Sequence, residues 1–485
     1  MRRIGFVILA TLFAVNLLAA PPVTESTESR KVAAWLRALP ALPSDSSHFG
    51  VLGGVSVISI GPQTGRVHDY GPTALYDDPQ ALSAAQGELK RHIDDYLTVL
   101  ATGGIHHFRD VQNLPWGMIE ISPGRFRYDL SDTIVANLQR IGGVYVGVIM
   151  PYAGWELVAA GYPKTSNPMC VRLLSEDFYY LNVDGRMDRY RDLRAYDRYL
   201  ENLVERYDGD GIDDMPGLTT PVRYWQIHNE PEGENCGLFR YDVPGFYDLM
   251  RRSAEIIHRS CAGCRMLNGG LAFPLDRESE PIGGATFWSD FVRLGGATTV
   301  DVIAIHYNQG KDPNHGSIDQ FEHQVRRSRE LLGNKPVWVT EFGVVIGNGT
   351  NFSGLPEHDA AAWFMRFYTV GLANGVEKFF SDAQVFVDPS FTITLPFYVN
   401  KLIESKLGSF DTAEKITDGQ YRFRSGSKWT YVSWNGIPSS LSGSVRVTDL
   451  YGNETLTTTT STSTLPTTDS PLFLEPLSRR HSVRR

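Results

Sequence analysis

The sequence contains few cysteines, no excess of positive charge and only one long apolar run. Its formal net charge is −9 at pH 7, which disfavours a nucleic-acid partner because nucleic acids bind basic surfaces. The 46 glycines and 27 prolines are close to ordinary usage for 485 residues, so collagen-like and low-complexity classes are excluded. What remains, 42% hydrophobic and 21% charged residues, is the composition of a folded globular protein.

The one long apolar run lies at the N-terminus. A basic head precedes apolar residues from Ile4 to Leu18, and two alanines follow. This order is typical of a secretory signal peptide over residues 1–20 and predicts a secreted or periplasmic protein. A membrane anchor is the alternative, but Asn16 and Pro21 shorten the run below the roughly 20 residues that a span requires. No later stretch is apolar enough, so we expect no stable membrane span after cleavage.

Export would place the four cysteines in an oxidising compartment, where an even number favours disulfides. Cys261 and Cys264 can close a tight loop, which leaves Cys170 and Cys236 as the second predicted pair. A metal site or a redox C-x-x-C motif is the alternative for the first pair. Its position between a predicted helix and a predicted strand argues against that alternative.

Short apolar runs alternate with amphipathic helical patterns from residue 49 onward. The eight predicted strands are Phe49–Leu52, Ile105–Phe108, Val144–Met150, Tyr224–His228, Arg265–Asn268, Val302–His306, Val337–Thr340 and Val376–Phe380. The stretch from Leu193 to Tyr207 shows the helix-face spacing between them. Eight such βα units predict an α/β fold of the (β/α)8 TIM-barrel class. An open doubly wound sheet is the alternative on periodicity alone.

The chain changes character after about residue 390. Residues 421–434 predict two strands joined by Ser-Gly-Ser, and Val445–Leu450 predicts another. The threonine-rich run 455–464 fits a strand or a glycosylated linker, and we expect strands of a small β-sandwich. The predicted division is a signal peptide at 1–20, an N-terminal leader at 21–48, the catalytic barrel at 49–390, the β-sandwich at 391–475 and a disordered tail at 476–485.

Two of the predicted strands run directly into a glutamate. One strand ends in Asn229-Glu230-Pro231, and another ends at Glu341. A carboxylate has no structural use at the end of a strand that is covered on both faces, but catalytic groups lie at the C-terminal mouth of such barrels. Two carboxyl groups that meet across a sugar can hydrolyse its acetal, one as proton donor and the other as nucleophile at about 5 Å.

These strand-end motifs, Asn229-Glu230-Pro231 and Thr340-Glu341-Phe342-Gly343, resemble glycoside hydrolase clan A and, within it, most closely the family thirty-nine group. Arg109 at the end of the second strand, Trp116 in a W-x-x-I-E stretch, and His306-Tyr307 at the end of the sixth strand add to the resemblance. One departure is the end of the eighth strand, residues 379–384, which has no tryptophan where many clan members place one under the sugar.

The resemblance implies that Glu230 is the general acid/base and Glu341 the nucleophile of a retaining enzyme. It also implies that Asn229 binds the 2-hydroxyl group of the sugar, and that Arg109 and Tyr307 orient Glu341. The remaining predicted substrate-binding residues are His306, Trp116, Tyr152 and Trp155. For His306 a buried core histidine is the alternative, and for Tyr152 and Trp155 it is packing at the rim.

An acidic loop contains Asp208, Asp210, Asp213 and Asp214, which are weak calcium candidates because clustered carboxylates supply oxygen ligands. The loop lacks the EF-hand order, since Ile212 occupies its fifth position. An acidic turn that ends a helix is the alternative.

The sequence therefore predicts a secreted retaining glycoside hydrolase without an organic cofactor. It would cleave β-glycosidic bonds of a polysaccharide or oligosaccharide by double displacement. A catalytically inactive polysaccharide-binding protein on the same barrel is the main alternative. A calcium-dependent adhesion module is a third possibility, and it depends on the acidic loop alone.

Overall fold

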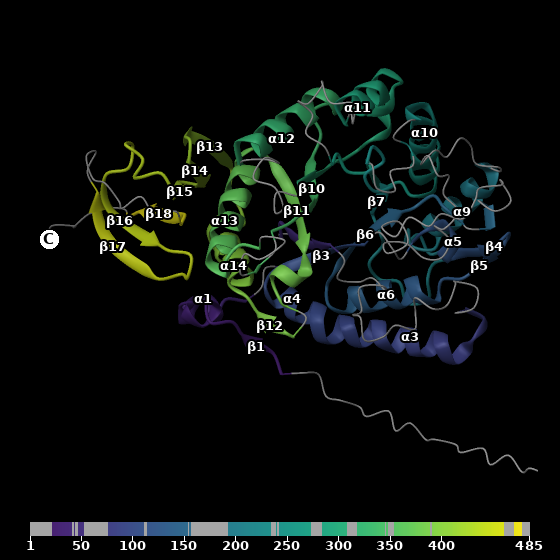
Figure 1. Cartoon of the computed structure of the whole chain (residues 1–485), viewed down its shortest axis with the longest axis horizontal. Helices are drawn as coiled ribbons and strands as arrows, with labels where there is room; N and C mark the ends of the chain where they lie inside the picture. Colours follow the sequence, from purple (N-terminus) through teal and green to yellow (C-terminus); the bar gives the residue numbers. More distant parts are fainter. Residues whose placement is uncertain are drawn as a thin grey trace, which may run out of the picture.

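The computed structural model of the chain describes most of the barrel and the C-terminal module (Figure 1). The described residues are 22–40, 43, 47–52, 76–110, 114–153, 155–156, 193–233, 239, 242–272, 284–307, 318–344, 346–347, 354–388, 390–459 and 470–477. The predicted signal peptide, the predicted pair Cys170–Cys236 and the tail from residue 478 lie outside them. Among the described residues, no helix has the length and apolarity that crossing a membrane requires.

Eight parallel strands form the barrel, and they coincide with the eight predicted strands. They are β2 (Phe49–Leu52), β3 (Ile105–Asp110), β6 (Val144–Ile149), β7 (Tyr224–Ile227), β8 (Arg265–Leu267), β9 (Ile303–Tyr307), β10 (Val337–Phe342) and β11 (Val376–Asp382). Their hydrogen-bonded order is β8-β7-β6-β3-β2-β11-β10-β9. Bridges from Leu267 to Val302 and from Leu271 to Ile305 join the two outer strands and close the sheet. The predicted TIM-barrel class is confirmed.

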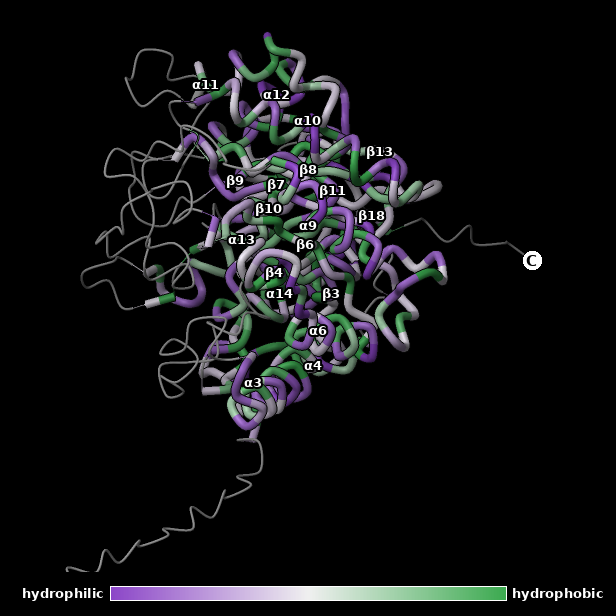
Figure 2. The backbone as a smooth tube through the Cα atoms, turned by 90° about the vertical axis from the view of Figure 1, so that its right-hand side faces the viewer, coloured by the Kyte–Doolittle hydropathy of each residue, from purple (hydrophilic) through white to green (hydrophobic). Residues whose placement is uncertain are grey.

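Helices surround this barrel. They are α3 (Pro79–His92), which continues through the π-helical turn η2 (Ile93–Leu97) into α4 (Thr98–Thr102), then α6 (Asp129–Arg140), α9 (Leu193–Glu205), α10 (Val243–Ser260), α11 (Gly284–Arg293), η4 (Gly296–Thr299), α12 (Ile318–Leu332), α13 (Glu357–Ala373), η5 (Ala383–Val385) and α14 (Leu395–Leu407). Each packs an apolar face inward, as Leu82, Ala85 and Leu89 do in α3. Figure 2 shows the resulting alternation of hydrophobic and hydrophilic stretches along α3.

Side chains inside the barrel form two layers of different chemistry. The lower layer, called the floor here, is mostly apolar and consists of Val146, Leu267, Val302, Ala304, Trp338 and Phe380, with Tyr224 and the buried ring of His107 packed against them. Gln226 lies two residues after Tyr224 on β7, and His306 lies two residues after Ala304 on β9. Arg109 occupies the corresponding place on β3. Because residues two apart face the same side of a strand, these buried polar residues form a second layer above the floor. We call it the mouth layer.

The C-terminal module is a six-stranded antiparallel sheet. Its strands are β13 (Thr412–Thr417), β14 (Gln420–Ser425), β15 (Lys428–Ser433), β16 (Gly443–Thr448), β17 (Glu454–Thr459) and β18 (Leu472–Pro476), in the order β13-β14-β15-β18-β16-β17. Figure 1 shows this sheet beside α13 and α14. The predicted strand-rich module is confirmed, and the threonine run forms a strand up to Thr459. The predicted boundary at residues 390–391 precedes α14.

The N-terminal leader joins the barrel to this module. Strand β1 (Thr24–Glu25) pairs in parallel with β12 (Thr392–Ile393), and the short helices η1 (Ser29–Lys31) and α1 (Ala34–Arg37) follow. The indole N–H of Trp35 donates to the carbonyl of Gly452 at 2.7 Å. The leader is therefore part of the folded body.

A disulfide joins Cys261 to Cys264, as predicted. It links the residue after α10 to the residue before β8, so it closes the turn that leads into a barrel strand.

Candidate active site

Glu341 faces the mouth because strand β10 contains a β-bulge. Trp338 pairs with Ala304 of β9, and Glu341 pairs with His306. Three steps along β10 therefore match two steps along β9, so β10 carries one extra residue. In a regular strand, residues three apart would point to opposite sides of the sheet. The bulge turns the carboxylate to the side that Trp338 faces, above the floor.

Glu230 lies in a turn with left-handed backbone angles directly after β7. The φ angle is 69° at His228 and 47° at Glu230, a conformation that costs a non-glycine residue roughly 1–2 kcal/mol. Two main-chain hydrogen bonds hold the turn, from Glu230 to the carbonyl of Gly269 at 2.7 Å and from Gly233 to the carbonyl of Glu230 at 2.9 Å. Backbone strain of this kind is common at functional sites.

His306 lies between the two carboxylates. Its Nδ1 is 2.7 Å from Oε1 of Glu230 and 3.7 Å from Oε2 of Glu341. One oxygen of each glutamate and one nitrogen of His306 lie within 4.8 Å of one another, so the two acids meet across the mouth. The side chains of Glu230 and Glu341 are 31% and 23% exposed, whereas that of His306 is 1% exposed. The two acids are open to a substrate, and the histidine supports them from below.

Arg109 determines where His306 carries its proton. The Nη2 atom of Arg109 is 3.4 Å from Nε2 of His306. A guanidinium can only donate hydrogen bonds, so Nε2 is the acceptor. Nδ1 then carries the proton that is donated to Glu230. Burial raises the pKa of Glu230, but this hydrogen bond and the positive charge of Arg109 outweigh burial and hold the pKa below its usual value. The ligand-free site therefore favours the carboxylate form of Glu230.

Arg109 is fully buried and contacts most of the mouth layer. Its Nε donates to Oε1 of Gln226 at 2.9 Å, and its Nη2 donates to Oδ1 of Asn229 at 2.5 Å. Its Nη1 lies 3.6 Å from Oε2 of Glu341. Burial lowers the pKa of the guanidinium, and the charges of Glu341 and Glu230 oppose that effect. Since the oxygen of Asn229 is bound to Arg109, its NH2 group is the part that can donate to a sugar hydroxyl.

Gly270 gives His306 the space it occupies. Its φ is 83°, and a Cβ atom there would lie 2.2 Å from Nε2 of His306. Any larger residue would displace the ring. The roles of Gly270 and Gln226 are not predicted above. Gln226 does carry a usable signal, because it is a polar residue in an otherwise apolar strand.

Glu232 is a third carboxyl group, buried next to the turn that carries Glu230. Its Oε1 accepts hydrogen bonds from the main chain of Ala272 at 2.8 Å and from the indole of Trp288 at 2.9 Å. Burial raises its pKa to about 7, although both hydrogen bonds act in the opposite direction. It ties the turn to α11 and to the segment after β8. No pattern in the sequence predicts this role, although the second glutamate of Asn-Glu-Pro-Glu is a usable signal.

Two of the predicted substrate-binding aromatics are core residues. Trp116, in α5 (Trp116–Ile119), has no exposed surface, and its indole donates to Glu120 at 2.6 Å. Tyr152 is 1% exposed, and its hydroxyl contacts the ring of His228. These positions do not support the predicted substrate contacts, because neither residue presents a free ring face.

Two other aromatics lie nearer the surface or beside the mouth. Trp155 is half-buried and donates its indole N–H to the carbonyl of Glu120 at 2.8 Å, next to the hairpin of β4 (Glu120–Ser122) and β5 (Arg125–Phe126). The ring of Tyr307 packs against Phe321 and Phe367. The contact of Trp155 with substrate and the contact of Tyr307 with Glu341 stay predictions.

Three of the four acidic-loop candidates come together. Oxygens of Asp208, Asp210 and Asp214 lie within 4.8 Å of one another, and Asp213 is outside this group. The carboxylate of Asp214 accepts main-chain hydrogen bonds from Gly209 and Gly211. The loop thus satisfies its own carboxylates in part, and calcium binding stays a prediction.

Comparison with known proteins agrees with this geometry. Residues 270–366, which include His306 and Glu341, match the family model described as glycosyl hydrolase catalytic core. The chain is similar to the structure of a family 39 glycoside hydrolase from Bacteroides cellulosilyticus WH2, with a TM-score of 0.55 and 14% identity over 90% of this chain and 82% of that one. It is also similar to a monomeric β-xylosidase from Caulobacter crescentus CB15, with a TM-score of 0.50 and 12% identity over 91% and 98% of the two chains. No curated protein matches the sequence significantly.

At such low identity, the structural similarity shows a shared fold. The family model adds that residues 270–366 are similar to a glycosyl hydrolase catalytic core. The resemblance to clan A and the prediction of a glycosidase are confirmed to this extent, and carbohydrate is the substrate class that such a core implies.

Proposed function

We propose that this protein is an exported β-glycosidase that retains the configuration of the sugar and acts on a polysaccharide or oligosaccharide. The observation that carries the proposal is the approach of Glu230 and Glu341 to within 4.8 Å across the barrel mouth. Carboxyl groups separated by about 5–5.5 Å act by direct attack, whereas a wider separation of roughly 6.5–9.5 Å leaves room for a water molecule and gives inversion.

In the first step an oxygen of Glu341 bonds to the anomeric carbon while the bond from that carbon to the glycosidic oxygen breaks. Glu230 transfers its proton to the departing oxygen, so the leaving group is a neutral alcohol. This step needs the protonated form of Glu230. A bound sugar excludes water from the mouth and disfavours the charged form, which adds to the effect of burial on its pKa.

In the second step the oxygen of a water molecule attacks the anomeric carbon and the ester bond to Glu341 breaks. The proton of that water passes to Glu230, which restores both groups. Glu230 must be ionised here, and this is the form that His306 favours by donating its Nδ1 proton at 2.7 Å. The Nη1 atom of Arg109 lies 3.6 Å from Glu341, so its positive charge stabilises the carboxylate of Glu341 when the ester bond breaks.

Incubation with an activated 2-fluoro sugar tests the proposal. The expected result is a mass increase of one glycosyl unit, located by peptide mapping on Glu341. Glu341→Gln serves as the control and should gain no mass. An adduct also separates a working enzyme from an inactive binding protein on the same barrel. If no member of a panel of β-configured fluoro sugars labels the chain, the proposed function is wrong.

A further inference from the structure

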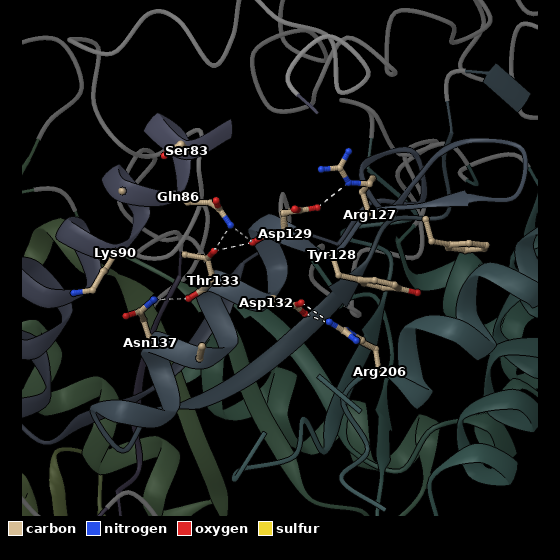
Figure 3. Close-up of a pocket in the computed structure, with 13 residues that line it drawn as sticks. Ser83, Gln86, Lys90, Arg127, Tyr128, Asp129, Asp132, Thr133, Asn137 and Arg206 are labelled. Carbon is tan, nitrogen blue, oxygen red and sulfur yellow. Dashed lines mark hydrogen bonds and ion pairs between the residues drawn. The ribbon is translucent and has the colours of Figure 1, made fainter. Parts of the chain in front are cut away.

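A groove of 810 Å³ lies on the outside of the barrel, between α3 and α6 (Figure 3). Its sides are the exposed faces of the two helices, with Gln86 and Lys90 on one and Thr133 and Asn137 on the other. Its volume falls within the range of roughly 300–1,000 Å³ that small-molecule sites occupy. None of the catalytic residues lines it.

The packing of α3 and α6 would allow a larger side chain to fill this groove. Gly87 lies in the interior of α3 and lines the groove opposite Ala136 of α6. A Cβ atom on Gly87 would meet no other atom within 4 Å, so a larger side chain would fit. Glycine inside a helix costs about 1 kcal/mol relative to alanine. The helix therefore keeps a residue that lowers its stability and leaves the hollow empty.

The charges along the groove are already paired. Arg127 lies 2.8 Å from Asp129, and Arg206 lies 2.5 Å from Asp132. Lys90 is paired with Asp94, which lies in η2 directly after α3. An anionic ligand would have to break one of these pairs, so the groove suits an uncharged, polar ligand.

The uncharged groups have the character of a sugar site. Gln86 donates to Thr133 and to the carbonyl of Asp129, and Asn137 donates to the carbonyl of Thr133, which holds both amides in place. Figure 3 shows both amide oxygens turned away from these hydrogen bonds, so they can accept from hydroxyl groups.

Two half-buried aromatic rings complete the lining. Phe126 and Tyr128 lie nearly parallel, with an interplanar angle of 10° and 6.5 Å between ring centres. An aromatic face packs against the apolar C–H face of a sugar ring, while amides bind its hydroxyl edge. The groove thus offers an aromatic surface for the C–H face of a pyranose and amides for its hydroxyl groups. The guanidinium of Arg206 lies 5.1 Å from the centre of the Tyr128 ring and covers part of that ring, so Phe126 is the less encumbered of the two.

We propose that this groove is a second glycan-binding site, which holds an uncharged stretch of the polysaccharide outside the catalytic centre. The inference rests on the proposed function in one respect, since it takes the ligand to be the same polymer that the mouth cleaves. A site of this kind raises the local concentration of polymer at the enzyme without touching the bond that breaks.

Gly87→Leu tests the groove by filling it, and Gly87→Ala is the matched control because it adds one methyl group. Both are made in a Glu341→Gln background, where binding is separate from turnover. The probes are soluble arabinoxylan, glucomannan and mixed-linkage β-glucan, with polygalacturonate as the charged comparison, in affinity gel electrophoresis. We expect Gly87→Leu to weaken binding of at least one neutral polymer about tenfold, and Gly87→Ala to stay within about twofold. Asn137→Ala, a surface change that removes one amide, should weaken the same polymer.

In the active enzyme, Gly87→Leu should lower kcat/KM for that polymer and leave kcat/KM for a short aryl glycoside unchanged. The groove proposal is overturned if Gly87→Leu binds every polymer as well as the parent, if no neutral polymer is bound, or if polygalacturonate is preferred. The two proposals fail separately. A fluoro-sugar adduct with unchanged polymer binding in Gly87→Leu overturns only the groove, and groove-dependent binding without an adduct overturns only the catalytic assignment.

Discussion

The floor and the mouth layer of the barrel are built by the same strands and obey different rules. Tyr224 and Gln226 are two residues apart on β7, and Ala304 and His306 are two residues apart on β9. The floor is held by the shape of apolar side chains. The mouth layer is held by hydrogen bonds between particular atoms, such as Arg109 to Gln226 at 2.9 Å. The bulge in β10 that turns Glu341 and the left-handed angles of Glu230 both occur at the mouth, so irregular backbone aims the two acids. Register shifts also occur lower in the barrel, between Val337 and Trp338 against β11 and between Phe49 and Gly50 against β3.

The largest expected effect is that of Glu341→Ala, a change in the mouth layer that should affect kcat far more than stability. Glu341→Ala should lower kcat by about 10⁴-fold or more, because it removes the attacking atom. Thermal unfolding should change less than in a floor variant, since Glu341 belongs to no apolar cluster and Glu230 remains as a second negative charge near the buried Arg109. Calorimetry and steady-state kinetics measure the two effects. The exposed Glu255 of α10 offers a control, and Glu255→Ala should leave kcat unchanged. A large loss of stability in Glu341→Ala would show that the two layers are not separable.

Glu230→Ala should slow substrates with poor leaving groups about 10²–10⁴-fold, because they need a proton on the departing oxygen. Substrates with good leaving groups, such as dinitrophenyl glycosides, need no such proton in the first step and should be slowed far less in that step. Pre-steady-state rates for a series of aryl glycosides measure the difference. Equal slowing across the series would contradict the acid/base assignment.

Trp338→Ala addresses the floor. Trp338 is 2% exposed and packs beside Tyr224, His107 and Phe380, so we expect a loss of about 3–5 kcal/mol in the free energy of unfolding. The kcat of the fraction that stays folded should change far less than it does in Glu341→Ala. Trp429→Ala is the matched control, because Trp429 is half-buried in the C-terminal sheet under Arg422, and it should cost less. Urea unfolding with active-site titration distinguishes the two outcomes.

Glu232→Gln gives the smallest expected effect and depends on pH. Burial raises the pKa of Glu232 to about 7 in the folded protein, from a usual value of 4.5. The folded state therefore holds a proton that the unfolded state has released, and this stabilisation is complete below pH 4.5 and is lost as pH rises through 7. Glutamine is neutral at every pH and keeps the accepting oxygen. The variant should gain roughly 1–3 kcal/mol relative to the parent between pH 5 and pH 8.5, measured by urea unfolding.

Glu404 of α14 sharpens this comparison. Burial raises its pKa to about 7 as well, although it lies beside Ser47 and His48 at the other end of strand β2 from the mouth. Glu404→Gln should flatten the pH dependence of stability to a similar degree. Only Glu232→Gln should also change the alkaline side of the pH–activity profile, because only Glu232 is attached to the turn of Glu230. Identical activity profiles for both variants would assign Glu232 a purely structural role.

The sequence predicted the strands and both acids because each strand is a short apolar run, buried on both faces, and Glu230 and Glu341 interrupt two of these runs. It did not predict how the acids are aimed. The bulge in β10 exists only in relation to its neighbours β9 and β11, and the ring of His306 is oriented by Arg109 and by the space at Gly270. These relations join residues that are far apart in the chain and leave no local pattern.

The buried aromatics show the same limit. Trp116 belongs to a motif that precedes the second barrel helix, and its position in the chain suggests the rim of the mouth. It is covered by Tyr196 and Tyr199 of α9, which the chain supplies some eighty residues later. Burial of a tryptophan depends on such distant partners, so the spacing that identified the motif carried no information about which face would be free.

The leader makes the order of synthesis matter for this molecule. Trp35 bonds to Gly452 across 417 positions of sequence, and Thr24 bonds to Phe391. A chain that is still emerging from a ribosome has made its leader long before the residues that receive the leader exist. These contacts can form only once the C-terminal sheet has been synthesised, so the leader is among the last segments to find its place although it precedes the barrel in the chain.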